Sequence, residues 1–184
     1  MVASPSEFGT AAGFMTTGNV VLTGFMGTGK STVGRALAEQ LSFAFVDTDE
    51  QIESTHGPIP EIFAKHGEAA FRELEAEVAA ELAQRSGLVI ATGGRMLLDE
   101  GNADALGATG AIFCLTAALD ELLRRLLTAE ERSARPLIDT DDPAARIETL
   151  LAERADGYGR FEQVDTTGRA VADIVREILD KLDR

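Results

Sequence analysis

Apolar residues occur along the chain in two alternating patterns. Short, nearly continuous apolar runs, typical of strands buried in a parallel sheet, lie at 19–23, 43–46, 88–92 and 111–115. Residues 163–165 are interpreted as a last short strand. Apolar residues at helical spacing fill the intervals, at 33–41, 68–85, 97–106, 119–127, 143–155 and 171–182. This alternation of strands and helices predicts an α/β fold around a parallel sheet.

Two stretches interrupt the alternation. Residues 51–67 contain Gly57, Pro58 and Pro60, so we expect two short helical pieces joined by a turn, forming a small lobe. Residues 128–142 have mixed charge, a proline and no apolar periodicity, which predicts an exposed loop. A loop of this length usually has a function or is disordered.

The composition narrows the class of protein. With 184 residues, of which 45% are hydrophobic, we expect a single domain at 19–184. The net charge of −14 argues against a duplex nucleic acid as partner, since phosphate contacts require clustered Lys and Arg. No apolar run is long enough to cross a bilayer. Residues 1–18 lack the features of a signal peptide and are interpreted as a flexible or vector-derived leader.

Without a signal peptide or a membrane-spanning run, a reducing cytoplasm is the expected compartment, and the cysteine and histidine content indicates no structural metal site. Cys114 is the only cysteine and lies in the apolar run 111–115, so it is expected to be a buried strand thiol. Together with His56 and His66, it gives no recognisable spacing of zinc or haem ligands.

A glycine-rich loop follows the first predicted strand and opens the first predicted helix. Its sequence at 24–32 is GFMGTGKST, which matches the pattern G-x-x-x-x-G-K-S of a P-loop. Glycines let backbone N–H groups point at phosphate oxygens, Lys30 would reach the β and γ phosphates, and the Ser31 hydroxyl would be a ligand for Mg²⁺. The alternative is a glycine turn with a helix cap at Ser31. The flanking strand and helix favour a nucleoside triphosphate site.

Two carboxylates stand at the end of the second predicted strand, where open α/β sheets place ligands. Asp47 and Asp49 are two positions apart. The alternative interpretation is a helix N-cap supplied by Asp49 or Thr48, and the sequence by itself favours the cap. The glycines at 93–94, which follow the third strand, are compatible either with close approach of a ligand or with a tight turn.

Two arginines are candidates for anion binding. Arg72 lies four residues after Glu68 in a predicted helix, which favours an ordinary surface ion pair. Arg154 continues the apolar stripe of Ile147, Leu150 and Leu151, so we expect its guanidinium to face inward and to meet an anion there. A ligand, a protein carboxylate and a guanidinium that snorkels to the helix end remain open.

Taken in order, these segments resemble the shikimate kinase family from about residue 19 to the last helix. The matching pieces are GFMGTGKSTVG at 24–34, FVDTD at 45–49, FRELE at 71–75, TGG at 92–94, RPLI at 135–138, and R-x-x-x-Y from Arg154 to Tyr158. The resemblance implies a three-layer α/β/α P-loop fold with a five-stranded parallel sheet, similar to nucleoside monophosphate kinases. It also implies a substrate lobe at about 49–75 and a lid at about 128–142.

The resemblance implies a cytoplasmic enzyme that phosphorylates a shikimate hydroxyl with ATP and Mg²⁺, in the pathway to aromatic amino acids. ATP and shikimate would be its partners, and we expect a monomer. The implied nucleotide-binding residues are Gly27, Thr28, Gly29, Lys30, Ser31, Thr32, Arg135 and Arg169, with Arg124 or Arg125 as a second stacking plane for adenine. The implied Mg²⁺ ligands are Ser31 and Asp47.

The remaining implied roles concern the acceptor and the reaction. The implied acceptor-binding residues are Asp49, Arg72, Gly93, Gly94 and Arg154. Arg72 and Arg154 would bind the carboxylate of shikimate, with Glu75 orienting Arg72. The implied catalytic residues are Lys30, Asp49 and Arg135, where Asp49 positions or deprotonates the attacking hydroxyl and Arg135 acts from the lid.

One residue departs from the family pattern. Where the family usually has three consecutive glycines, this chain has Gly93, Gly94 and Arg95. Arg95 either points to solvent, pairs with an acidic neighbour, or changes the acceptor, and a positive φ at this position would strain the backbone. The alternatives to shikimate phosphorylation are a kinase for a related polyol acid or aminated analogue, and a nucleotide-binding paralogue without catalysis.

Overall fold

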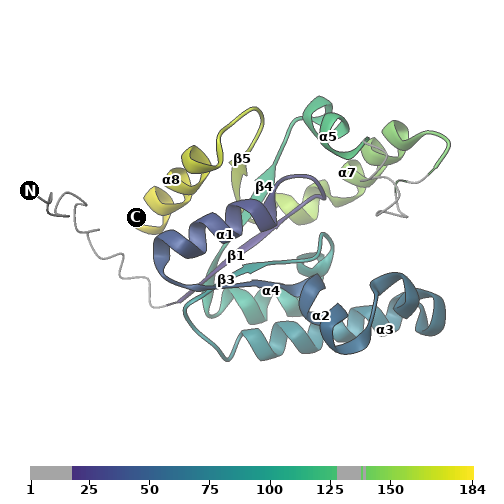
Figure 1. Ribbon diagram of the computed structural model, residues 1–184, viewed down its shortest axis with the longest axis horizontal. Coiled ribbons are helices and arrows are strands. Elements are labelled where there is room, and N and C mark those ends of the chain that lie inside the picture. The colour runs from purple at the N-terminus through teal and green to yellow at the C-terminus, as the bar shows by residue number, and fades with distance from the viewer. Residues whose placement is uncertain (1–17, 128–137, 139) are drawn as a thin grey trace, which may run out of the picture.

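The computed structural model describes residues 18–127, 138 and 140–184, and within them a five-stranded parallel sheet lies between layers of helices (Figure 1). The strand order is β2-β3-β1-β4-β5, and every pair of neighbours is parallel. The prediction of an α/β fold with a parallel five-stranded sheet is therefore confirmed. The strands are β1 (Asn19–Gly24), β2 (Ala44–Asp47), β3 (Leu88–Ala91), β4 (Gly110–Thr116) and β5 (Glu162–Asp165).

Helices cover both faces of the sheet. Helices α1 (Lys30–Leu41) and α8 (Val171–Leu182) pack together on one face, and α3 (Ile59–Leu82) and α4 (Glu100–Gly107) pack together on the other (Figure 1). Figure 1 also shows α2 (Thr48–His56) and α3 below one end of the sheet, with α5 (Leu119–Leu126) and α7 (Pro143–Gly159) above it. This end is where the strands terminate.

The two covered faces explain why the central strand β1 has consecutive apolar residues. Along β1, Val20 and Leu22 enter the core beneath α1 and α8, whereas Val21 enters the core beneath α3 and α4. All three side chains are fully buried. Successive side chains of a strand point to opposite faces, so a strand covered on both faces loses the alternation of apolar and polar residues.

Several predicted boundaries change in ways that affect the site. The predicted helix at 68–85 is the second part of α3, which is interrupted at Gly67 (φ 81°, ψ 174°) and ends at Leu82. The predicted helix at 97–106 is a 3₁₀ turn, Met96–Leu98, followed by α4. Helix α7 continues past residue 155 to Gly159. Tyr158 therefore lies on the same face as Arg154, one turn further on.

The N-cap predicted for α2 was wrong by one or two residues. Asp47, rather than Thr48 or Asp49, is the cap, and its Oδ1 accepts a hydrogen bond from the Asp49 backbone N–H at 3.1 Å. Asp47 has an extended backbone (φ −105°, ψ 121°), which leaves its side chain free to turn back over the first helical turn. The side chain of Asp49 is therefore not needed for the cap.

Cys114 is buried in β4, as predicted, and burial raises the pKa of its thiol to about 11. Within the described ranges, no helix is long and apolar enough to span a membrane. Most of the predicted leader and lid, including Arg135, lies outside the described residues. The boundaries of the lobe and the lid stay predictions.

Candidate active site

The glycine-rich loop joins β1 to α1 and curls at the end of the sheet. Gly24 has φ 129°, and a Cβ built there would lie 2.2 Å from the Leu115 carbonyl oxygen, so no larger residue fits. Gly29 also has positive φ (93°) and is the N-cap of α1, which starts at Lys30. The first N–H groups of an α-helix have no partner within the helix and carry partial positive charge. The loop therefore offers an anion-binding cradle.

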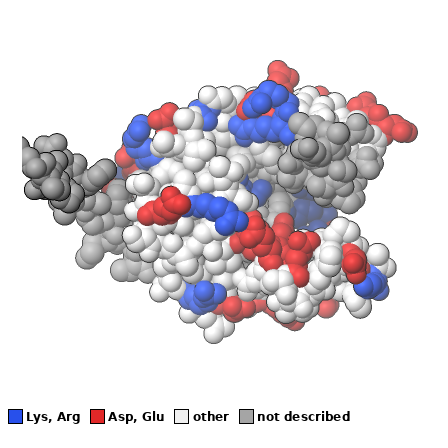
Figure 2. Space-filling model, viewed as in Figure 1, with Lys and Arg blue, Asp and Glu red and all other residues white. Residues whose placement is uncertain are grey.

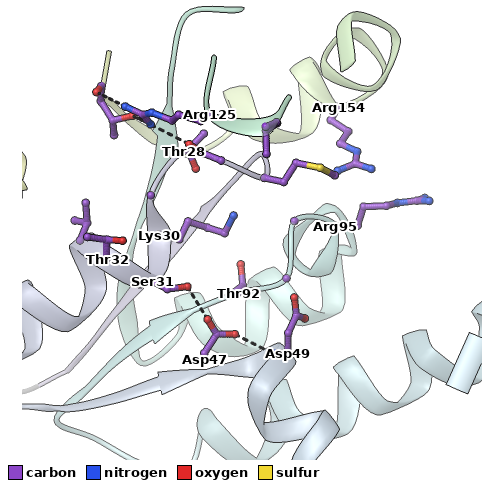
Figure 3. Close-up of a pocket in the computed structure, with 18 of the residues that line it drawn as sticks. Thr28, Lys30, Ser31, Thr32, Asp47, Asp49, Thr92, Arg95, Arg125 and Arg154 are labelled. Carbon is purple, nitrogen blue, oxygen red and sulfur yellow. Dashed lines mark hydrogen bonds between the residues drawn. The ribbon is translucent and has the colours of Figure 1, made fainter. Parts of the chain in front are cut away.

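The polar side chains beside this loop are held in place by short hydrogen bonds. Lys30 Nζ donates to the carbonyl oxygens of Gly24 (2.9 Å) and Phe25 (3.0 Å), and in Figure 3 it points into the pocket. Ser31 Oγ donates to Asp47 Oδ2 at 2.7 Å (Figure 3). The Thr28 hydroxyl is used within the loop, where it donates to Phe25 O at 2.8 Å. The Thr28 backbone N–H also donates to Phe25 O, at the longer distance of 3.4 Å.

The pair of Ser31 and Asp47 fits a Mg²⁺ site. Both side chains supply oxygen ligands, which Mg²⁺ prefers, and they already touch each other. Across the part of the chain that the structure describes, no group of three His, Cys, Asp or Glu side chains could hold a metal ion by itself. Mg²⁺ in phosphoryl-transfer sites is usually held by one or two protein ligands, with waters and phosphates completing the shell. The residues present therefore suit a metal that arrives with a nucleotide.

Asp49 has an unusual environment at the start of α2. Its Oδ1 is buried and has no hydrogen-bond partner among the described residues. Burial, followed by the nearby charge of Asp47, raises the pKa of Asp49 to about 6, although Lys30 acts in the opposite direction. A buried oxygen without a partner costs free energy, and a hydroxyl of a ligand would satisfy it.

Gly93 lies directly against this carboxylate. A Cβ at Gly93 would meet Asp49 Oδ1 at 2.7 Å and Glu75 Oε1 at 3.0 Å. The Gly93 N–H donates to Thr48 Oγ1 at 3.0 Å, which fixes the end of β3 to α2. The glycine therefore leaves room for two carboxylates from different helices to approach the end of β3.

Arg72 is surrounded by two carboxylates of its own helix. Its Nη1 donates to Glu75 Oε2 at 2.5 Å, and its Nη2 and Nε donate to Glu68 Oε1 at 3.0 and 3.3 Å. Glu75 is 1% exposed, and burial raises the pKa of its carboxyl although Arg72 opposes the shift. Glu75 is thus placed to orient Arg72, while the predicted ion pair with Glu68 is also present.

Arg154 faces inward from α7, as the apolar stripe predicted. The residue is 5% exposed, and its guanidinium carbon lies 5.3 Å from the centre of the Phe25 ring. No carboxylate of the described residues forms a salt bridge with it, which removes one of the alternatives left open by the sequence for that part of the chain. A Cβ at Gly94 would lie 3.5 Å from Arg154 Nη1, and Tyr158 donates to Gly94 O at 2.5 Å. Arg154 is therefore a buried cation that contacts Phe25 and has no carboxylate partner among the described residues.

Arg95 adopts a relaxed backbone and pairs with an acidic neighbour. Its φ and ψ are −113° and −9°, so the strain expected from a positive φ does not arise. Its Nη1 donates to Glu68 Oε1 at 3.0 Å, and its side chain is 49% exposed. The ion pair with an acidic neighbour is therefore present, and Arg95 also lines the cavity.

Three arginines near the other end of the site differ in their contacts. Arg169 pairs with Glu177 at 2.6 Å and also donates to Asp165 O. Arg125 donates to Gly27 O at 2.9 Å and to Thr166 O at 3.1 Å. Arg124 is 70% exposed and pairs with Glu121. The contact between Arg125 and Gly27 spans 98 positions, and no local sequence signal indicated it.

One cavity of about 660 Å³ brings these groups together. Figure 2 shows the molecule hollowed at the end of the sheet, with acidic side chains gathered over α2 on the lower rim. Of the predicted site residues that the structure describes, Arg124 does not line this cavity, and the others do. Arg135 lies outside the described residues. The lining includes Gly27, Thr28, Gly29, Lys30, Ser31, Thr32, Asp47, Asp49, Arg72, Gly93, Gly94, Arg154 and Arg169, and in addition Arg95 and Arg125.

The family model described as shikimate kinase matches residues 26–183, nearly the whole of the described chain. The chain belongs to the shikimate kinase family. A shikimate kinase of Geobacter metallireducens is 43% identical over 167 residues, covering 90% of this chain and 92% of the relative. A shikimate kinase of Thermus thermophilus is 41% identical and covers 90% of both chains. As a member of this family, the protein is an ATP-dependent and Mg²⁺-dependent kinase.

Solved structures agree with this family assignment. The shikimate kinase from Acinetobacter baumannii in complex with shikimate has a TM-score of 0.84 at 36% identity and covers 92% of this chain and 94% of its own. A gluconokinase from Sinorhizobium meliloti has a TM-score of 0.62 at 24% identity and covers 92% of this chain and 93% of its own. The latter shows only that the fold is shared with other small-molecule kinases.

Proposed function

We propose that this protein transfers the γ-phosphoryl group of ATP to a hydroxyl of shikimate, giving shikimate 3-phosphate. The observation that carries the proposal is the cavity. In it, the buried Asp49 Oδ1, which has no hydrogen-bond partner among the described residues, and the buried Arg154 guanidinium lie beside the P-loop. A molecule with both a carboxylate and hydroxyls complements these two groups. Shikimate has this chemistry, and the Acinetobacter baumannii relative was solved with shikimate.

On the acceptor side, the two ends of shikimate meet different residues. Its carboxylate pairs with Arg72 and Arg154, since guanidinium groups bind carboxylates through parallel, charge-assisted hydrogen bonds. The backbone of Gly93 and Gly94 lines the pocket between Asp49 and Arg154. A ring hydroxyl donates to Asp49 Oδ1, which lacks a partner among the described side chains. The acceptor is thereby held at both ends.

On the nucleotide side, the P-loop residues position the phosphates. The backbone of residues 27–32 and the Lys30 ammonium bind the β- and γ-phosphates, and Ser31 with Asp47 holds Mg²⁺. When bound, Mg²⁺ neutralises charge on the phosphate oxygens. Arg169 and Arg125 border the cavity beyond Gly27, where the base would lie. Arg135, outside the described residues, is proposed to act on the γ-phosphoryl group from the lid.

The reaction is an in-line displacement without a covalent enzyme intermediate. The acceptor hydroxyl oxygen forms a bond to the γ-phosphorus, and the bond between that phosphorus and the bridging oxygen of ADP breaks. The hydroxyl proton passes to Asp49, whose pKa of about 6 leaves it mostly ionised near neutral pH and able to accept a proton. Lys30 offsets the charge that develops on the phosphates.

We further propose that the protein acts as a cytoplasmic monomer on small molecules only. The described part of one chain lines the cavity on both the nucleotide and acceptor sides. The net charge of −14 disfavours nucleic acids. Size-exclusion chromatography with light scattering would test the monomer.

A coupled assay of ADP release tests the proposed activity. We expect turnover with Mg·ATP and shikimate, and a product that mass spectrometry identifies as a monophosphate of shikimate. Gluconate and an aminated shikimate analogue serve as competing acceptors, because Arg95 stands where the family usually has glycine. A folded protein that turns over one of these but not shikimate would contradict the proposal.

A further inference from the structure

Arg95 and Arg72 share one carboxylate oxygen at the rim of the cavity. Arg95 Nη1 lies 3.0 Å from Glu68 Oε1, and Arg72 Nη2 lies 3.0 Å from the same atom. Arg95 comes from the end of β3, whereas Glu68 and Arg72 belong to α3. Figure 3 shows that Arg95 and Arg154 lie on the side of the pocket remote from Ser31. A glycine at position 95 would have no side chain to make this connection.

The contact with Glu68 occupies the Nε–Nη2 edge of the Arg72 guanidinium. Both Nε and Nη2 of Arg72 donate to Glu68 Oε1, and Nη1 donates to the buried Glu75. A bidentate pair with a carboxylate requires two parallel N–H groups of the guanidinium. An acceptor carboxylate that approaches the Nε–Nη2 edge must therefore displace Glu68.

Glu68 is suited to such an exchange because it is exposed and has a second partner. Its side chain is 53% exposed, in contrast to Glu75 at 2%. Hydrogen bonding to Arg72, together with the charges of Arg72 and Arg95, lowers the pKa of Glu68 and keeps it ionised. When Glu68 leaves Arg72, Arg95 still offers it a cationic partner.

We propose that Arg95 is a specificity-determining residue, which retains Glu68 at the rim and so makes the Nε–Nη2 edge of Arg72 available to the acceptor carboxylate. This inference rests on the proposed function, since it requires an acceptor with a carboxylate. Arg95 acts through Glu68 and is a positioning residue. Without it, Glu68 has only Arg72 as partner and competes with the acceptor.

A double-mutant cycle at positions 95 and 68 tests this exchange. Shikimate binding is measured by isothermal titration calorimetry for the wild type, Arg95→Met, Glu68→Gln and the double variant. We expect Arg95→Met to weaken binding about two- to fivefold, the range for an exposed ion pair. In the Glu68→Gln background the same substitution should change binding less than about 1.5-fold, because the competing carboxylate is gone.

One control removes the carboxylate of the acceptor, and another removes an exposed positive charge outside the cavity. The carboxamide of shikimate should bind the wild type and Arg95→Met equally, since it cannot compete as an anion. Arg85→Met removes a similarly exposed arginine, paired with Glu81 outside the cavity, and should leave shikimate binding unchanged. Circular dichroism melting of each variant identifies any loss of folded protein.

The outcomes distinguish this inference from the proposed function. If Arg95→Met weakened shikimate binding equally with Glu and with Gln at position 68, Arg95 would contact the acceptor itself. The proposed transfer of Glu68 from Arg72 to Arg95 would then be wrong. Unchanged shikimate binding by Arg95→Met would also overturn it, while the proposed function would stand. A wild-type protein that neither binds nor phosphorylates shikimate would overturn the proposed function instead.

Discussion

The two sides of the cavity satisfy their polar groups in different ways. On the P-loop side, defined by Lys30, Ser31 and Asp47, each side chain already has protein partners within about 3 Å. On the acceptor side, defined by Asp49, Arg72 and Arg154, a buried carboxylate oxygen has no hydrogen-bond partner, and the buried Arg154 guanidinium has no carboxylate partner, among the described residues. The first side is complete without a ligand, and the second is not.

This difference has a thermodynamic consequence. Buried polar groups without partners destabilise the folded protein, and a ligand that satisfies them recovers that free energy on binding. We therefore expect substitutions on the acceptor side to reduce function while increasing stability wherever they remove an unsatisfied group. Substitutions on the P-loop side remove satisfied contacts, so they should reduce function without increasing the free energy of unfolding.

Asp49→Asn should give the largest combination of reduced activity and increased stability. Loss of a catalytic base typically lowers kcat by about 10²- to 10⁴-fold, and we expect a loss in this range. The free energy of unfolding at pH 7 should rise by as much as about 3 kcal/mol, because each pKa unit corresponds to about 1.4 kcal/mol. Steady-state kinetics and thermal unfolding measure the two effects. Asp104→Asn, an exposed carboxylate on α4, is the control and should change neither.

The pH dependence follows from the raised pKa of Asp49. Because the pKa is about 6 in the folded protein and 3.8 is the ordinary value, the folded protein takes up the proton at higher pH than the unfolded chain does. The destabilisation is complete above pH 6 and is relieved as the pH falls toward 4. The stability gained in Asp49→Asn should therefore shrink over this window, and the wild-type kcat/KM should fall below about pH 6. A pH-independent difference in stability would contradict this assignment.

The P-loop itself was predictable because its residues are contiguous. The positions of Gly24, Gly29, Lys30 and Ser31 follow from one strand, one turn and one helix, and each hydrogen bond within the loop spans few residues. The inward orientation of Arg154 was also predictable, since the apolar stripe of α7 defines its face. A contiguous motif determined the first result, and helical periodicity determined the second.

The contacts that the sequence did not reveal depend on tertiary structure. Arg125 reaches Gly27, and Arg95 reaches Glu68, only after separate βα units are packed together. The choice of Asp47 as the cap of α2 depended on backbone angles at the end of β2 rather than on residue type, since Asp47, Thr48 and Asp49 can all act as caps. Side-chain contacts between distant segments have no periodic signal in the sequence.

Arg154→Met should produce the next largest effect. We expect shikimate binding to weaken about 10- to 100-fold, because a hydrogen-bonded ion pair is lost, and ATP binding to change less than about twofold. The free energy of unfolding should rise by about 1–3 kcal/mol, since an apolar side chain replaces a buried cation. Calorimetry and chemical unfolding provide these values. Arg176→Met, an exposed arginine on α8, is the control for the loss of one charge.

Arg72→Met provides a contrast within the acceptor side. It should weaken shikimate binding to a similar extent, but it should lower the free energy of unfolding because Glu75 is left buried without its partner. If Arg72→Met and Arg154→Met changed stability in the same direction, the distinction between satisfied and unsatisfied cations would be wrong.

Arg125→Met and Arg124→Met test the nucleotide side and should give the smallest effects. Arg125 connects Gly27 O in the P-loop with Thr166 O after β5, so its loss should raise the KM for ATP about three- to tenfold. Arg124 is an exposed neighbour that shares Glu121, and its loss should change this KM less than about twofold. Shikimate affinity and the free energy of unfolding serve as the second readout. If Arg125→Met stabilised the protein while weakening ATP binding, the nucleotide side would also contain an unsatisfied cation, and the contrast between the two sides would fail.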